Sequence, residues 1–534
     1  MRPPRPWIRR DTTIAAGRRD TSARGSSRGD RDSRLLAAPS LVLAAILLLG
    51  SAIILPRLGD QSLWVDEGLT IGPALDAADM GDLVARVRAV DTQPPGSHLV
   101  LWSLRDVLPR TEFFFRLPSF LAIEAGLIVL YFLVARLWRP SIALLCVALA
   151  QLSPYLAYFA AEARNYGLWF LAIVVSWYAF ARWHEAQTRS DAARWRLGLL
   201  WAGANAAGLW LHLFHVFVIV AQGAVVLALI VAARERRSAL RYAAAAALWQ
   251  AVAVLLFAPW LLALTRGVSR EVGVRWTRPF SLPVAVYQVF ALHFGTSLGP
   301  NLRDLHDKPF SSLVADNALS FAAGGAAIAL TAICLALAVR DAGRERTRRW
   351  ELLPFVVAPL VGAVAPIAYA VTTRFPLHPR HLLFLWTVLP LVLAVTAVRR
   401  PGWRIAVAAV AALQLVALGN LLVNPYYAKD DERAAIAFAE SQSQGTTYVL
   451  GDVAFYYCTT ARGHLHDFLH FAPETEQVWL IDNRAWEPEN QQFRARLEER
   501  LASRGFTPRP TFTQFRGIVL RHWTLDRREP SDRG

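Results

Sequence analysis

Two adjacent acids follow the first long apolar run of the chain, where they could move protons. Asp66 and Glu67 lie in "WVDEGLT", shortly after the apolar run at 35–55. Charged groups at the end of a membrane span are costly, so they are default candidates for function. A carboxylate at this boundary could act as a general base on a hydroxyl group. The structural alternative is that Asp66 caps the helix that follows.

A third acid lies in the aromatic segment "AYFAAEARNYGLW" at 157–169. Tyr158, Glu162 and Tyr166 recur at helical spacing, so a continuous helix would place the carboxylate on an aromatic stripe. A purely structural salt bridge between Glu162 and Arg164 is the alternative, but side chains two residues apart do not face each other on a helix. We therefore predict that Glu162 is catalytic and that the two tyrosines line a substrate.

Imidazole and guanidinium groups gather at the ends of two later apolar segments. His212 and His215 have an i,i+3 spacing that could bind a metal, but we favour packing at the membrane interface as their role. Arg374 and Arg380 lie in "TTRFPLHPRHLLF" and could hold a phosphate through bidentate contacts or reach lipid headgroups instead. Acids, aromatic rings and arginines at one membrane face suit a sugar carried on a lipid phosphate.

The composition requires a membrane to position these groups. The chain has 534 residues, of which 54% are hydrophobic, and a mean hydropathy of +0.31. Apolar runs near 20 residues are long enough to cross a bilayer. We predict an all-α polytopic membrane protein with eleven spans, at 35–55, 114–136, 141–160, 165–183, 197–214, 216–233, 242–264, 313–339, 351–372, 381–398 and 404–423.

The distribution of arginine predicts the orientation. The net charge is +16, and the basic residues are almost all arginine, with Lys308 and Lys429 as the only lysines. With a basic disordered tail (1–34) in the cytoplasm, every inner loop is arginine-rich, as the positive-inside rule expects. The charge is therefore topological, and nucleic acid is not an expected partner. A plasma (inner) membrane location follows.

Two regions are expected outside the cytoplasm. The first long loop (56–112) contains a short amphipathic stretch at 93–109, which predicts an interfacial helix. Residues 424–534 are polar and mixed, with helices predicted near 430–442 and 489–505, the second ending at Gly505. Strands are predicted near 446–452 and 477–482, and a strand or a hairpin at 512–525. Because eleven is odd, this α/β domain should be extracytoplasmic.

Several other kinds of chemistry lack a sequence signature. The three cysteines do not suggest a disulfide framework, since Cys146 and Cys334 lie in predicted spans and Cys458 is isolated. No CxxC, HExxH, P-loop or GxGxxG motif is present. Nucleotide-driven chemistry is therefore unsupported.

Over residues 35–423 the chain resembles a known family. The motifs that carry the resemblance occur in the family's order: "WVDEGLT", "DTQPPGSHLVLW", "FFFRLPSFLA", "RLWRPSIALL", "PYLAYFAAEARNYGL", "LHLFHVFVIVAQ" and "PRHLLFLWTVLPL". They resemble polyprenyl-phosphate-sugar-dependent glycosyltransferases with the GT-C fold, which include the protein O-mannosyltransferases and the lipid A aminoarabinose transferases. The resemblance implies a GT-C bundle and transfer of a monosaccharide, a mannose or a pentose, to a hydroxyl of a lipid, glycan or protein acceptor, with inversion expected.

The resemblance also implies roles for single residues. It implies that Asp66 deprotonates the acceptor with Glu67 beside it, that Glu162 and Arg164 line the donor site, and that Arg380 holds the phosphate, with Arg374 as a further candidate. Gln93, in Gln93-Pro94-Pro95, departs from the Glu-Lys-Pro of some relatives and so removes a metal ligand and a phosphate-binding lysine. His381 departs from a frequent tyrosine. We keep Gln93 and His212 as lining residues, assign no metal ligand, and treat a divalent metal as optional.

Two other function classes stay open. A transporter needs ionisable residues or broken helices near the middle of the membrane, whereas the predicted spans look apolar through their middles. A non-catalytic scaffold that presents residues 424–534 during cell-envelope glycan assembly leaves Asp66 and Glu162 unexplained. Acids gathered in one cavity at one face would favour the enzyme, and acids at the membrane midplane would favour transport.

Overall fold

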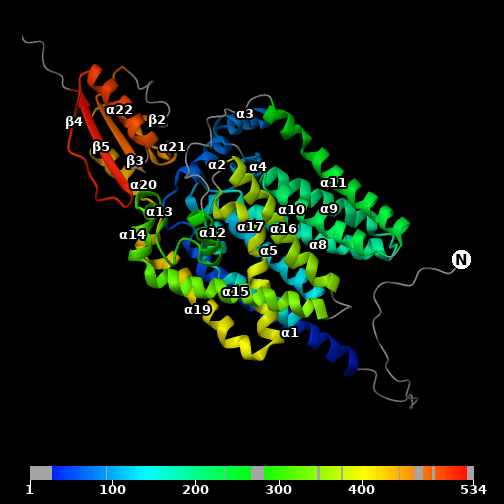
Figure 1. Ribbon diagram of the computed structural model, residues 1–534. Coiled ribbons are helices and arrows are strands. Elements are labelled where there is room, and N and C mark those ends of the chain that lie inside the picture. Colours follow the sequence, from blue (N-terminus) through cyan, green and yellow to red (C-terminus); the bar gives the residue numbers. More distant parts are fainter. Residues whose placement is uncertain are drawn as a thin grey trace, which may run out of the picture.

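The computed structural model describes residues 27–91, 93–233, 235–265, 282–344, 349–373, 377–443, 445–459, 461–463, 473–483 and 488–525. A bundle of long helices forms most of the molecule, and a small sheet stands at one end of it (Figure 1). The helices of the bundle are α1 (Ser27–Ile54), α5 (Glu112–Leu137), α6 (Pro140–Gln151), α7 (Pro154–Ala160), α8 (Tyr166–Thr188), α9 (Arg194–Leu211), α10 (His215–Ala232), α11 (Arg236–Thr265), α12 (Leu282–Phe294), α15 (Ala318–Arg344), α16 (Arg349–Thr373), α17 (Leu383–Trp386), α18 (Val388–Arg399) and α19 (Arg404–Val423).

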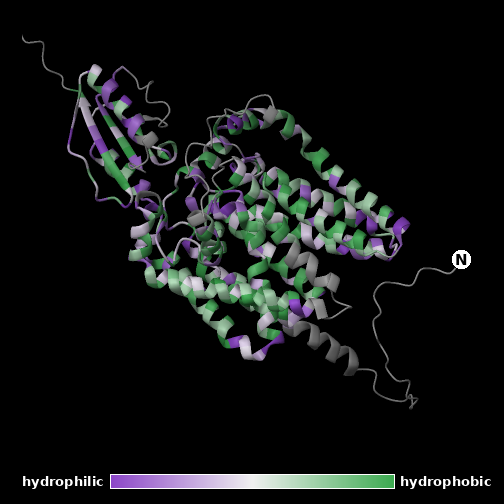
Figure 2. Ribbon diagram, viewed as in Figure 1, coloured by the Kyte–Doolittle hydropathy of each residue, from purple (hydrophilic) through white to green (hydrophobic). Residues whose placement is uncertain are grey.

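The bundle has the surface of a membrane protein. Each of the eleven predicted spans overlaps one of these helices or a consecutive pair, although α8 and α9 are not among the described helices that are apolar enough to count as candidate spans. Among the described residues, seven helices are long and apolar enough to cross a membrane, and α6 with α7, bent by 67°, would make an eighth. Large apolar side chains point outward, with Leu319 and Ile405 each 84% exposed, as expected where lipid replaces water as the solvent. Figure 2 shows the apolar character along these helices.

The helix predicted through the aromatic segment is interrupted. α7 ends at Ala160 and α8 begins at Tyr166, so Glu162 lies in the intervening turn and not on a continuous stripe. Two side chains from other helices hold the backbone of this turn. The N–H of Ala163 donates to Glu67 Oε1 (2.9 Å), and Ser119 Oγ donates to the carbonyl oxygen of Arg164 (3.0 Å). These contacts compete with the backbone hydrogen bonds that would continue the helix.

The interior of the bundle is more polar than the sequence suggested. Glu124 of α5 accepts a hydrogen bond from Gln151 Nε2 (3.1 Å). A buried network also joins α8 to α11, in which Asn205 Nδ2 donates to Gln222 (3.0 Å) and Gln250 (2.9 Å). The prediction that the spans are apolar throughout was wrong at these points. Hydrogen bonding among the polar groups themselves makes their burial tolerable.

The first loop consists of short elements that lie over one end of the bundle. These are η1 (Leu55–Arg57), α2 (Val65–Asp76), α3 (Met80–Val90) and α4 (Gly96–Leu104). α4 corresponds to the helix predicted within 93–109. At the N-terminus, α1 begins at Ser27, so residues 27–34 are helical although we expected them in the tail, and residues 1–26 lie outside the described residues. Between α12 and α15 lie α13 (Leu302–Asp307) and α14 (Phe310–Asp316).

The C-terminal unit is an α/β structure, as the sequence predicted. The elements are η4 (Pro425–Tyr427), α20 (Glu432–Ser441), β1 (Thr447–Leu450), α21 (Ala454–Tyr457), β2 (Ala461–Gly463), β3 (Gln477–Asn483), α22 (Pro488–Ser503), β4 (Phe506–Pro508) and β5 (Ile518–Leu525). The strands lie in the order β2-β1-β3-β5-β4, with β1 parallel to β2 and β3, and β5 antiparallel to β3 and β4. Gly505, with φ 84°, follows α22 as the predicted helix stop.

The two faces of this sheet pack on different partners. Along β3, Val478 and Leu480 face α22, where they pack with Leu497. Trp479 and Ile481 face the other way, into a cluster that includes α20 and residues of the first loop, among them Ile71 of α2. The alternation follows from the period of two in a strand. The C-terminal unit therefore shares part of its hydrophobic core with the first loop.

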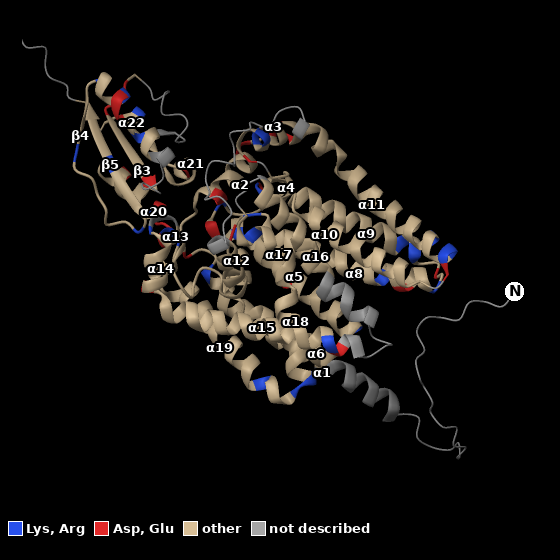
Figure 3. Cartoon of the chain, in the orientation of Figure 1, with Lys and Arg blue, Asp and Glu red and all other residues tan. Residues whose placement is uncertain are grey.

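Charged side chains lie mainly at the two ends of the bundle (Figure 3). Arginine predominates at the end away from the sheet, where the loops between α8 and α9 and between α18 and α19 lie. At the other end, positive and negative side chains mix between α2 and the C-terminal unit. This mixed end contains most of the predicted site residues.

Candidate active site

The two adjacent acids lie in the first turn of α2 but face different surroundings. Trp64 occupies the N-cap position and makes no side-chain capping bond, so Asp66 does not cap the helix. Consecutive residues on a helix point in directions about 100° apart. Glu67 is fully buried (0% exposed), whereas the Asp66 side chain is 19% exposed.

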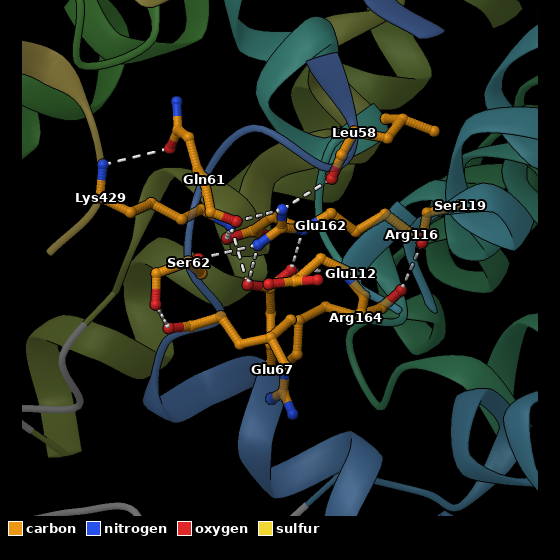
Figure 4. A network of polar contacts seen from close by, with 12 residues as sticks. Leu58, Gln61, Ser62, Glu67, Glu112, Arg116, Ser119, Glu162, Arg164 and Lys429 are labelled. Carbon is orange, nitrogen blue, oxygen red and sulfur yellow. Dashed lines mark hydrogen bonds and ion pairs between the residues drawn. The ribbon is translucent and has the colours of Figure 1, made fainter. Parts of the chain in front are cut away.

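Glu67 is an anchored carboxylate. Arg116 donates to both of its oxygens, at 2.7 and 2.8 Å, and Lys429 Nζ lies 3.2 Å from Oε2. Arg116 also donates to the carbonyl oxygens of Leu58, Gln61 and Ser62, so it joins the end of α1 to α2 (Figure 4). Burial alone would raise the pKa of Glu67, but Arg116, Lys429 and the N–H of Ala163 hold it at about 2. Glu67 therefore stays ionised at neutral pH and does not accept a proton there.

Asp66 pairs with an arginine that is distant in sequence. Arg380, in the 3₁₀ helix η2 (Pro379–Leu382), donates from Nη1 to Asp66 Oδ2 at 2.5 Å. Its guanidinium also lies over the ring of Tyr166, 5.9 Å from the centroid. The alternative in which Arg380 only reaches lipid headgroups is not what the structure shows. Its Nε atom is buried and has no hydrogen-bond partner among the described residues, so it can donate to a ligand.

Arg164 lies within the same cluster. Its Nη1 donates to Thr70 Oγ1 (2.7 Å) and to Asp91 Oδ2 (2.9 Å), and its side chain is 7% exposed. The alternative salt bridge with Glu162 is not formed, because Arg164 pairs with Asp91. Its Nε is also buried without a hydrogen-bond partner in the described part of the chain.

Glu162 pairs with Lys429 in the turn between α7 and α8. The two charged groups are 3.7 Å apart, and Glu162 is 1% exposed. Burial raises the pKa of Glu162 to about 7, with Lys429 opposing the rise, Glu67 and Asp66 adding to it, and a hydrogen bond with Tyr158 opposing it. Its Oε1 has no hydrogen-bond partner among the described residues. Near neutral pH this carboxyl group can therefore gain or lose a proton.

The remaining predicted residues lie at different distances from this cluster. The Gln93 N–H donates to Asp91 Oδ1 (2.9 Å), so Gln93 is adjacent to the ion pair of Asp91 with Arg164.

The two predicted histidines have different surroundings. The His212 ring stacks on the Trp169 ring, with centroids 4.1 Å apart, and faces the His381 ring at 5.9 Å. His215 is instead part of the helix-joining network, with its Nε2 3.0 Å from Asn205 Oδ1. Arg374 lies outside the described residues.

Sequence reasoning missed three members of the cluster. They are Asp91, Arg116 and Lys429, which pair with Arg164, Glu67 and Glu162 respectively. Asp91 and Arg116 belong to the motifs "DTQPPGSHLVLW" and "FFFRLPSFLA", which pointed to the region but not to the residue. The sequence signal for Lys429 was that it is a lysine, since nearly all the other basic residues of the chain are arginines.

The side chains of the described residues do not fit a resident divalent metal. No three His, Cys, Asp or Glu side chains among the described residues are grouped so that they could hold one ion. Asp66, Glu67 and Glu162 each pair with an arginine or lysine instead. A metal ion would have to displace one of these cations.

Comparisons with known proteins identify the fold. No protein-family model and no curated protein sequence matches the chain. ArnT from Cupriavidus metallidurans in the apo state has a similar structure, with a TM-score of 0.54 and 14% identity over 92% of this chain and 98% of ArnT. ArnT bound to undecaprenyl phosphate gives a TM-score of 0.52 and 12% identity over 90% and 97% of the two chains. The chain is thus a multi-pass membrane protein with the GT-C fold of ArnT.

Proposed function

We propose that this protein is a membrane glycosyltransferase that moves a monosaccharide from a polyprenyl-phosphate donor to an acceptor hydroxyl. The Asp66–Arg380 pair carries the proposal, because it places a carboxylate 2.5 Å from a guanidinium suited to phosphate. Arg164 adds a second guanidinium with a buried donor atom. The undecaprenyl phosphate bound to ArnT, a protein with the same fold, supports a donor of this chemical class.

The proposed reaction is a direct displacement at the anomeric carbon. The acceptor oxygen attacks this carbon while its proton passes to Asp66, and the bond from the sugar to the phosphate oxygen breaks. The bonding electrons stay with the phosphate, whose developing charge Arg380 and Arg164 stabilise. Because the phosphate leaves as a stable anion, it needs no general acid, and no step passes through a metal. A single displacement inverts the anomeric centre.

The sugar and the acceptor remain part of the proposal. The motifs suggest a mannose or a pentose, and a lipid, glycan or protein as acceptor. The arginine-rich loops suggest that the N-terminus is cytoplasmic and that residues 424–534 lie outside, so the reaction would take place at the outer face of the inner membrane.

A transporter is the second candidate, and Glu124 is the observation that favours it. This acid of α5 lies within a candidate span, with Gln151 as its hydrogen-bond partner. By contrast, Asp66, Glu67 and Glu162 gather at one end of the bundle, which supports the enzyme. A scaffold would not require these buried pairs of charges.

The test is transfer of a labelled monosaccharide from a purified polyprenyl-phosphate donor by the full-length protein in lipid nanodiscs. Mannosyl and pentosyl donors are compared, with membrane lipids, glycans and peptides as acceptors, and NMR establishes the anomeric configuration of the product. We expect transfer with inversion. A retained anomer would exclude the single displacement, and accumulation of free labelled substrate across a sealed membrane without transfer would favour the transporter.

A further inference from the structure

Lys429 brings a charge from outside the bundle into the candidate active site. It lies in the connection between α19 and α20, at the start of the C-terminal unit. Its side chain is only 10% exposed, although the connection around it is at the surface of the bundle. The other lysine of the chain, Lys308, has a side chain that is 42% exposed and pairs with Asp304. The two lysines therefore have different environments.

Both sides of the connection hold the backbone of Lys429. Its N–H donates to Gln61 Oε1 of the first loop at 3.1 Å. Its carbonyl oxygen accepts from Arg516 Nε of the C-terminal unit at 2.8 Å. The position of Lys429 thus depends on the packing of the C-terminal unit against the first loop.

The side chain of Lys429 ends between two acids and two aromatic rings. Its Nζ lies 3.2 Å from Glu67 Oε2 and 3.7 Å from Glu162 Oε1 (Figure 4). It also lies 5.6 Å from the ring centroids of both Trp64 and Tyr158. Aromatic faces attract a cation, and more strongly when water is excluded. These four groups therefore hold the ammonium in one position.

The charges of the cluster are balanced in pairs. Four acids pair with four cations among the described residues: Asp66 with Arg380, Asp91 with Arg164, Glu67 with Arg116, and Glu162 with Lys429. A buried charge without a partner is strongly unfavourable. Glu67 would keep its ion pair with Arg116 if Lys429 were removed, whereas Glu162 would keep no ion pair within 4 Å among the described residues. The loss of Lys429 should therefore act mainly through Glu162.

We propose that Lys429 is a positioning residue of the glycosyl-transfer site, which favours the ionised form of Glu162 and orients it beside Tyr158, so that Glu162 Oε1 can accept a hydrogen bond from a hydroxyl of the bound sugar. This inference rests on the proposed function. It makes the C-terminal unit part of the active site, because that unit sets the place of Lys429.

The pH dependence follows from the groups that face Glu162. Burial raises the pKa of Glu162 to about 7, Lys429 and the Tyr158 hydroxyl lower it, and Glu67 and Asp66 raise it. Removing the ammonium should raise this pKa further, and an opposite charge at this range shifts a carboxyl pKa by about 1–3 units. A Glu162 side chain that is protonated at neutral pH would be less able to accept a hydrogen bond from a sugar hydroxyl.

The first experiment measures kcat/KM against pH for the full-length protein in nanodiscs, with a labelled polyprenyl-phosphate sugar as the donor. The variants are Lys429→Met, Lys429→Arg and the matched control Lys308→Met. We expect Lys429→Met to move the acidic limb upward by about one pH unit or more, with activity partly recovered at alkaline pH. Lys429→Arg should largely restore the wild-type limb, and Lys308→Met should not change it. An unshifted limb in Lys429→Met would overturn the inference while leaving the proposed function intact.

The second experiment does not depend on catalysis. The apparent thermal midpoint is measured against pH for wild type, Glu162→Gln, Lys429→Met and the double variant. In the folded protein the pKa of Glu162 is raised from 4.5 to about 7. Its contribution to stability is therefore fully present below pH 4.5 and is lost as the pH rises through 7. Lys429→Met should enlarge this loss and extend it to higher pH, and Glu162→Gln should abolish it.

The double variant covers the case in which Lys429→Met folds poorly. Replacing Glu162 with Gln removes the acid that would lack a cation, so the double variant should be more stable than Lys429→Met alone at neutral pH. Additive effects of the two substitutions would show that Lys429 and Glu162 are not coupled, and this would overturn the inference. If no sugar transfer is found with any donor, the proposed function fails, and the thermal experiment still decides whether Lys429 controls Glu162.

Discussion

Arg380 donates to Asp66 at 2.5 Å, although the two residues are separated by 314 positions in the sequence. In this arrangement the guanidinium neutralises the carboxylate that we propose as the general base. Capture of the donor phosphate by Arg380 would weaken this pair and make Asp66 more available to the acceptor hydroxyl. The pair thus links donor binding to proton transfer, and it leads to separate expectations for its two members.

Replacing Asp66 with Asn should abolish most catalysis without loss of donor binding. The amide keeps the shape but cannot take the proton, so turnover should fall by about 10²–10⁴. The affinity for polyprenyl phosphate should stay equal or rise, because Arg380 no longer has a carboxylate partner. Turnover is measured by transfer of labelled sugar and affinity by calorimetry in nanodiscs. Near-normal turnover would remove Asp66 from the role of base.

Replacing Arg380 with Ala should weaken donor binding more than a comparable arginine substitution elsewhere. Arg400→Ala is the matched control, because Arg400 pairs with Asp341 at 2.6 Å with similar exposure, 27% and 21% against 29% and 19% for the Arg380 pair. Loss of a charge-assisted contact with phosphate should raise the Kd about tenfold or more, since such bonds contribute about 1.5–3 kcal/mol. Equal effects of both substitutions would argue against a phosphate role for Arg380.

Glu67 should stabilise the fold in a pH-dependent way. Its pKa is lowered from 4.5 to about 2, so its stabilising contribution is present above pH 4.5 and is lost as the pH falls through 2. Glu67→Gln should lower the thermal midpoint at pH 7 and flatten its decline between pH 4.5 and about 2. Glu185→Gln is the control, because its ion pair with Arg136 is partly exposed and should contribute only about 0–1 kcal/mol. A midpoint unchanged by Glu67→Gln would contradict the anchoring role.

The packing of the C-terminal unit on α2 should be sensitive to the size of residue 68. A Cβ added at Gly68 would lie 3.1 Å from Val453 Cγ1 and 3.3 Å from the carbonyl oxygen of Asp452. Gly68→Leu should therefore separate the two surfaces, increase cleavage of residues 424–534 by added protease, and lower turnover. Gly223→Leu is the control, since a Cβ at Gly223 meets no atom within 4 Å. Equal protease resistance in the two variants would show that this contact does not hold the unit.

The orientation in the membrane should follow the arginine-rich loops. A reporter that is active only outside the cytoplasm should work when it is fused after Gly534 and fail when it is inserted between α8 and α9. The physical reason is the positive-inside rule, since Arg189, Arg194 and Arg196 cluster near that loop. The opposite pattern of reporter activity would reverse the topology and place the proposed reaction on the cytoplasmic face.

Much of the architecture is encoded locally. Apolar runs of sufficient length specify membrane helices wherever they occur, because the bilayer requires every backbone polar group to be satisfied within the segment. The short continuous apolar run in "QVWLID" likewise specifies β3 as a strand that is buried on both faces of the sheet. The acids of "WVDEGLT" and the arginine of "PRHLL" could be selected for the same reason, since their types and places at the ends of spans are visible in the sequence.

Only the tertiary structure decided which charge faces which. Asp66 and Glu67 are neighbours of the same chemical type, yet one pairs with Arg380 and the other is enclosed by Arg116. Helical geometry separates their directions, but the surroundings on each side come from α5 and η2, which are far away in the sequence. The contact of Lys429 with Glu67 spans 362 residues. Local patterns describe the face of one element, whereas the partners of a buried charge depend on how several elements pack together.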